Sequence, residues 1–67
     1  LSATAHRKLS NKLDAAAASE AAGNDKRALQ QLAALRELAT DAALVPDAGV
    51  RAVLARDIDA LTAVIRG

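Results

Sequence analysis

The sequence contains no cysteine and no phenylalanine, tryptophan or tyrosine among its 67 residues. Without cysteine, no disulfide or thiolate–metal site can reinforce the fold, although this says little about the redox compartment. Without aromatic side chains, which supply much of the area in cores and binding faces, the core must come from leucine, valine, isoleucine and alanine. A chain this short buries only about 60% of the surface that its unfolded form exposes, so we expect marginal stability.

Charge and hydropathy argue against two classes of partner. Nine basic and eight acidic side chains give a net charge of +1, so we expect no nucleic-acid partner and no anionic membrane as the organising surface. The chain has no apolar run of 18 residues and no signal-peptide pattern, so we expect no membrane insertion. Because it starts at Leu1 and not at Met, we expect residues 1–67 to be a single domain from a larger chain.

Most of the sequence consists of segments that favour helix formation. The whole chain is 52% hydrophobic and rich in alanine. Two breaks, Gly23-Asn24 and Val45-Pro46-Asp47, separate three segments with helical spacing of apolar residues. We predict helices at about 3–22, 25–43 and 48–65, with Ser2, Asn24 and Asp47 as N-caps and Gly23 as the C-terminal cap of the first. Short connections then predict an all-α fold, an antiparallel up-down-up three-helix bundle.

Apolar residues mark the faces on which these helices should pack. The second helix carries leucines at 29, 32, 35 and 38, which sweep about half of its circumference, so it should be the middle element that contacts both others. The predicted face of the first helix comprises Ala5, Leu9, Leu13, Ala16, Ala17 and Glu20. The predicted stripe of the third helix comprises Val50, Val53, Leu54, Ile58, Leu61, Val64 and Ile65.

The alanine block of the first helix should let the second helix approach closely. We expect Ala16 and Ala17 to face the bundle. Ala15 and Ala18 should face outward. Alanine at these two positions would then reflect either its high helix propensity alone or a contact with a partner.

Asp57 interrupts the apolar stripe of the third helix. Because a buried unpaired carboxylate is costly, we expect Asp57 either to be solvated or paired with Lys12 or Arg36, or to be a polar contact for a partner. Lys26 and Arg27 open the second helix, where the helix dipole disfavours cations, which hints at an acidic partner.

Other charged residues have simpler interpretations. His6 is expected to be a surface residue or to form a hydrophobic staple with Leu1, and Arg7, Lys8 and Lys12 to be a solvated face. We also expect an ion pair between Asp47 and Arg51. No phosphate-binding loop, HExxH, CxxC or GxSxG motif is present, and we predict no enzyme activity, no metal site and no cofactor.

The segment Leu9–Ala39, LSNKLDAAAASEAAGNDKRALQQLAALRELA, resembles the small helical modules called FIMAH-type domains. The resemblance rests on Leu9, Lys12, Leu13, Asp14, Ala15, Ala16, Gly23, Asn24, Ala28, Leu32 and Leu35, and Leu54, Ile58 and Leu61 resemble the family's third helix. The family often has phenylalanine near the position of Leu35, and leucine there keeps a core role without the aromatic ring.

The resemblance implies a non-catalytic accessory domain of an extracellular bacterial hydrolase, many of which act on polysaccharides. Its role would be protein–protein interaction, association with the cell surface, or spacing, by docking of helix faces. Two alternatives stay open: a carbohydrate-binding module that targets a cell-wall or other glycan, and a docking domain of an intracellular assembly. The candidate contact residues are Asp57, Lys26, Arg27, Ala15 and Ala18.

Overall fold

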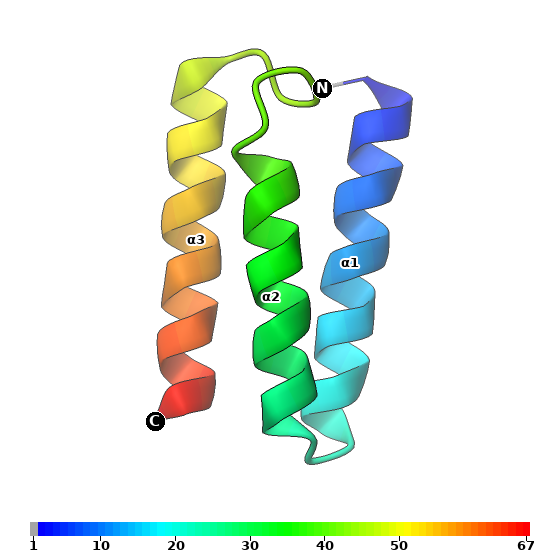
Figure 1. Ribbon diagram of the computed structural model, residues 1–67, viewed down its shortest axis with the longest axis vertical. Helices are drawn as coiled ribbons and strands as arrows, with labels where there is room; N and C mark the ends of the chain where they lie inside the picture. The colour runs from blue at the N-terminus through cyan, green and yellow to red at the C-terminus, as the bar shows by residue number, and fades with distance from the viewer. Residues whose placement is uncertain (1) are drawn as a thin grey trace.

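The computed structural model describes residues 2–67 and contains three helices in that range, with no strand. They are α1 (Ala3–Ala21), α2 (Asp25–Ala39) and α3 (Ala48–Arg66). The chain runs down α1, up α2 and down α3, and α2 lies between the other two (Figure 1). The predicted all-α three-helix fold is therefore confirmed, with neighbouring helices antiparallel. Leu1, the proposed staple partner of His6, lies outside the described residues.

Each helix begins at the predicted N-cap. The side-chain oxygens of Ser2, Asn24 and Asp47 each accept hydrogen bonds from backbone N–H groups two or three residues later, at 2.8–3.2 Å. These bonds satisfy N–H groups that have no partner inside the helix, which is why a short polar residue at these positions fixes where the helix starts.

Gly23 and Asn24 make the tight turn between α1 and α2. Gly23 has a φ of 78°, a left-handed conformation that costs glycine nothing and other residues about 1–2 kcal/mol. The Asn24 N–H donates to the Ser19 carbonyl at 2.9 Å, and the Gly23 N–H donates to the Glu20 carbonyl at 3.0 Å. This is the Schellman arrangement, and it brings α2 back alongside α1.

The second helix ends at Ala39, four residues before the predicted end at Ala43. The Asp41 carboxylate accepts a hydrogen bond from the Ala43 N–H at 2.9 Å, and the Val45 N–H donates to the Asp41 carbonyl at 2.8 Å. Val45 is wholly buried. The turn at Asp41 and the burial of Val45 thus override the helix propensity of the alanines at 42 and 43.

Arg51 holds the α2–α3 loop in place instead of pairing with Asp47. Its Nη1 donates to the carbonyl oxygens of Val45 and Pro46, at 2.8 and 2.9 Å, while the Asp47 carboxylate caps α3. The predicted ion pair between Asp47 and Arg51 is therefore wrong, because each side chain satisfies a backbone group instead.

The core lies mainly between α1 and α2. Alanines on both helices are buried there, as expected if small residues allow close approach. The buried apolar residues are Ala5, Leu9, Ala16, Ala28, Leu32, Leu35, Ala39, Val45 and Ile58. Helix α2 packs against both α1 and α3, which confirms its predicted place as the middle element. From α3, Ile58 alone is buried.

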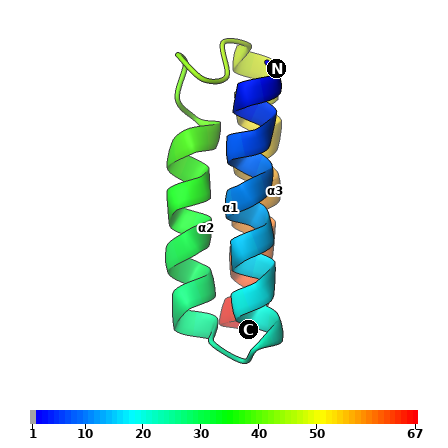
Figure 2. The same cartoon turned by 90° about the vertical axis from the view of Figure 1, so that its right-hand side faces the viewer.

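Helices α1 and α3 lie on the same side of α2. In the view turned by 90°, α1 lies in front of α3 and α2 stands to one side of both (Figure 2). Because α1 and α3 both pack on α2 far more than on each other, the side of the molecule opposite α2 stays open.

Candidate docking groove

A groove runs between α1 and α3, with α2 as its floor. It consists of two adjoining hollows with volumes of about 280 and 290 Å³. The first is lined by the N-terminal half of α1 and the middle of α3, and the second by the C-terminal halves of both helices. Leu13 and Leu61 line both hollows, so they mark the point where the two meet.

The α3 wall of the groove is apolar and uncovered. Leu61 and Val64 line the groove and are 43% and 77% exposed, and Val50 and Val53 on the same helix are also exposed. The apolar stripe predicted for this helix is wider than α2 can cover. Ile58 is buried against the core, whereas Leu61 and Val64 stay largely exposed.

The α1 wall differs from the predicted face of that helix. Leu13, Ala17 and Glu20 were expected to face the bundle, but they are exposed and line the groove. Ser19 is buried in their place. The reason is that α1 packs mainly on α2, so its contact face is centred on Ala16 and turned toward α2.

Asp57 lines the first hollow from the α3 side, and its side chain is exposed. Of the alternatives expected for Asp57, pairing with Arg36 is not formed, because Arg36 binds Asp59. Arg36 Nε donates to Asp59 Oδ1 at 2.8 Å and Nη2 donates to Oδ2 at 3.3 Å. No pairing of Asp57 with Lys12 is seen either, since Arg36–Asp59 is the one ion pair within residues 2–67.

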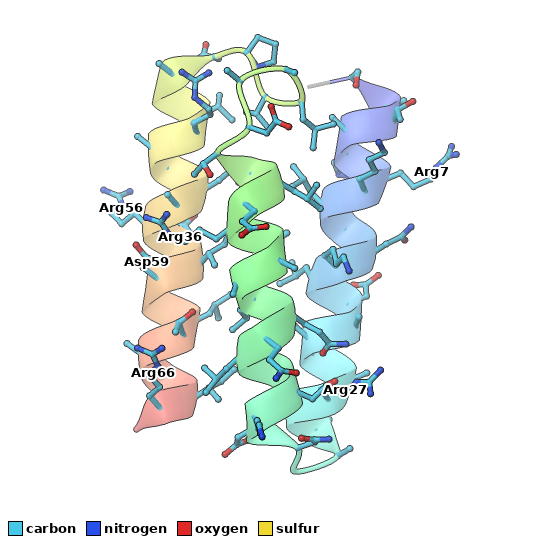
Figure 3. All side chains as sticks on the ribbon, viewed as in Figure 1. Arg7, Arg27, Arg36, Arg56, Asp59 and Arg66 are labelled. Carbon is cyan, nitrogen blue, oxygen red and sulfur yellow. The ribbon has the colours of Figure 1, made fainter. Side chains whose placement is uncertain are left out.

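Arg36 and Asp59 join α2 to α3 on the face of α3 away from the groove, and both side chains are about half exposed (Figure 3). The hydrogen bond from Arg36 lowers the pKa of the Asp59 carboxyl group below its usual value. The same bond raises the pKa of the Arg36 guanidinium. This exposed pair contributes little to stability.

Comparison with known protein families shows the family of this chain. A family model described as the FIMAH domain matches residues 1–63, nearly the whole chain. The chain belongs to the FIMAH domain family. The match confirms the resemblance seen in the sequence and identifies a small accessory domain. No curated protein and no solved structure matches the chain.

The remaining candidate contact residues of this FIMAH domain lie away from the groove. Ala18 is exposed, as predicted, but Ala15 is half-buried in a shallow hollow with Lys12 and Leu38. Lys26 and Arg27 are exposed in the first turn of α2. Arg27 lies on the α1 side of the molecule (Figure 3), so the structure does not bring these cations to Asp57.

One polar contact between α1 and α2 escaped the sequence analysis. Ser19 Oγ donates a hydrogen bond to Gln31 Oε1 at 2.5 Å, and Ser19 is buried. The spacing of Ser19 three residues after Ala16 is a signal that could have placed it on the contact face. Because a buried hydroxyl without a partner is costly, this bond fixes the register of α1 on α2.

Other surfaces of the FIMAH domain are weaker candidates for a binding site. A wide hollow of about 660 Å³ lies along α1, but that one helix and its cap form the whole lining, so it encloses nothing. Within residues 2–67 no group of three or more acidic or histidine side chains lies close enough to hold a metal ion. No helix of this part of the chain is long and apolar enough to cross a membrane.

Proposed function

We propose that this FIMAH domain is a non-catalytic accessory module of a secreted bacterial hydrolase that binds a protein partner in the groove between α1 and α3. The observation that carries the proposal is the uncovered apolar wall of the groove, above all Leu61 and Val64. Contiguous apolar side chains on the surface of a small domain are costly in water unless a partner covers them. The family match supports a small accessory domain, and its place beside a hydrolase is part of the proposal.

The shape of the groove suits a helix. Both walls are helices of 19 residues, which run in the same direction and are each about 28 Å long. A fourth helix laid between them would cover the apolar stripes of both and turn the open arrangement into a four-helix one. An amphipathic helix held in an apolar groove is a common mode of protein recognition.

The polar groups in the groove favour binding over catalysis. His6, Asp57 and Glu20 are its ionisable side chains, and within residues 2–67 no hydrogen bond joins any two of them. A general acid or base needs a partner that orients it toward a substrate. Glycan binding and intracellular docking remain predictions, and the groove lacks the aromatic platforms that sugar rings usually require.

Removing the domain from its parent enzyme tests the non-catalytic part of the proposal. The enzyme without residues 1–67 should hydrolyse a small soluble substrate with unchanged kcat/KM. A fall of tenfold or more, with the catalytic domain still folded, would contradict an accessory role.

A single substitution tests the groove. Leu61→Asp places a charge on the exposed wall, whereas Ala60→Asp places the same charge on the same helix at an exposed position outside the groove. Size-exclusion chromatography of the secreted fraction separates the free parent enzyme from its complex with the partner protein. The Ala60→Asp enzyme should elute as the complex, and the Leu61→Asp enzyme should elute at its own mass. Equal behaviour of the two variants would argue against the groove.

A further inference from the structure

We propose that the occupant of the groove is an amphipathic helix with an apolar stripe and two basic residues about three turns apart, one for Asp57 and one for Glu20. This inference rests on the proposed function and names the chemistry of its partner. Both carboxylates line the groove, Asp57 in the first hollow and Glu20 in the second. Both are exposed, and neither forms an ion pair within residues 2–67.

The groove has a one-sided charge. In the described part of the chain no lysine or arginine lines either hollow, although the domain has nine of these residues in all. Its cations lie elsewhere: Arg36 is bound to Asp59 and Arg51 to the loop. A partner that brings its own cations would find two carboxylates with no competing ion-pair partner among the described residues.

The axial spacing follows from the helices. Leu13 and Leu61 mark the same level of the groove, because both line both hollows. Glu20 lies seven residues beyond Leu13, and Asp57 lies four residues before Leu61, so the two carboxylates are about 16 Å apart along the groove. On a partner helix this distance corresponds to about eleven residues, which bring both cations back to nearly the same face.

The charges argue against a second copy of this domain as the occupant. A two-fold symmetric dimer would place the same surface on both sides of the interface. Asp57 and Glu20 would then face an equally acidic groove, with His6 as the one basic group lining it among residues 2–67. A head-to-tail contact would avoid this but would form rings or open chains of copies. A separate basic helix fits the groove without either problem.

Two designed peptides test the inference on the isolated domain. Its capped helices and internal core are the basis for using it alone, and circular dichroism checks that it is helical and melts cooperatively. Both peptides are 18-residue helices with the same leucine stripe. One carries lysine at the two positions eleven residues apart, and the other carries glutamate there. Isothermal titration calorimetry measures both affinities.

The lysine peptide should bind at least tenfold more tightly than the glutamate peptide at low salt, and the difference should shrink at high salt. Asp57→Asn with Glu20→Gln should reduce the preference to about threefold or less. The matched control, Asp14→Asn with Glu37→Gln, makes the same change in net charge at exposed residues outside the groove and should leave the preference unchanged.

The remaining outcomes separate this inference from the proposed function. Equal affinity for the two peptides, with Leu61→Asp abolishing both, would overturn the basic helix and leave groove docking standing. If neither peptide binds, the basic helix is overturned. The comparison of Leu61→Asp with Ala60→Asp in the parent enzyme would still test whether the groove binds a partner. Self-association of the free domain in analytical ultracentrifugation, abolished by Leu61→Asp, would overturn it in favour of a second copy.

Discussion

Leu13 of α1 and Leu61 of α3 line both hollows of the groove, and each side chain is 43% exposed. They come from helices that run side by side in the same direction, yet neither is covered by the other's helix. In a closed three-helix bundle, residues at these positions would be buried against one another. Because they are exposed, these two leucines do not belong to the core that stabilises the fold, and a partner could cover them.

Truncation of the groove leucines should therefore barely change stability. Leu13→Ala or Leu61→Ala should lower the free energy of unfolding by less than about 1 kcal/mol, because half-exposed side chains lose little on truncation. Leu32, which is 2% exposed between the helices, is the contrasting site. Leu32→Ala should cost about 2–5 kcal/mol and unfold much of so small a domain. Urea denaturation followed by circular dichroism measures all three, and equal losses would contradict the open groove.

The bond between Ser19 and Gln31 should show as a coupling energy. In a double-mutant cycle of Ser19→Ala and Gln31→Ala, the two changes should be non-additive by about 0.5–1.5 kcal/mol, since each single variant already breaks the bond. Thermal unfolding of the four proteins at one pH provides the measurement. Additive effects would mean that the bond does not contribute to the α1–α2 contact.

The turn at Gly23 should tolerate asparagine better than alanine. Gly23→Ala should destabilise the domain by about 1–2 kcal/mol, because the φ of 78° is unfavourable for a side chain with a Cβ. No atom within 4 Å would clash with that Cβ, so the cost is conformational. Gly23→Asn should cost less, since asparagine visits the left-handed region more readily. The reverse order in chemical denaturation would contradict the Schellman turn.

The ion pair between Arg36 and Asp59 should affect the pKa of Asp59 more clearly than the free energy of unfolding. The hydrogen bond from Arg36 lowers the pKa of the Asp59 carboxyl group in the folded domain. Its contribution to stability is therefore complete above the pKa of an unfolded aspartate and is lost as the pH falls through the lower, folded pKa. Carboxyl-detected NMR should show Asp59 titrating below the usual range of an aspartate. In Arg36→Gln this difference should disappear, and its persistence would mean that another group causes it.

Local signals in the sequence predicted the fold well. Ser2, Asn24 and Asp47 mark the start of each helix and Gly23 follows the end of α1, so capping chemistry alone located these four boundaries to within about one residue. The end of α2 could not be predicted in this way. It depends on Val45, a loop residue whose burial is decided by packing across the chain.

The groove could be predicted only in part. The sequence marked Asp57 as a polar residue in an apolar stripe, and left open a role as a partner contact. It could not show that α1 and α3 would leave Leu61 and Val64 uncovered, because the spacing within one helix does not say how far two others stand apart. Arg36 was offered as a partner for Asp57, but it binds Asp59, which points about 200° away from Asp57 around α3. The spacing within α3 does not say which side of that helix Arg36 reaches.

Site-specific photocrosslinking in the parent enzyme tests the central claim most directly. A photoreactive amino acid is placed at position 61, in the groove, or at position 60, exposed on the same helix outside it. We expect a discrete crosslinked protein from position 61, absent from position 60, and the crosslinked peptide should be helical with basic residues beside an apolar stripe. Crosslinks of equal yield from both positions, or from position 60 alone, would contradict docking in the groove.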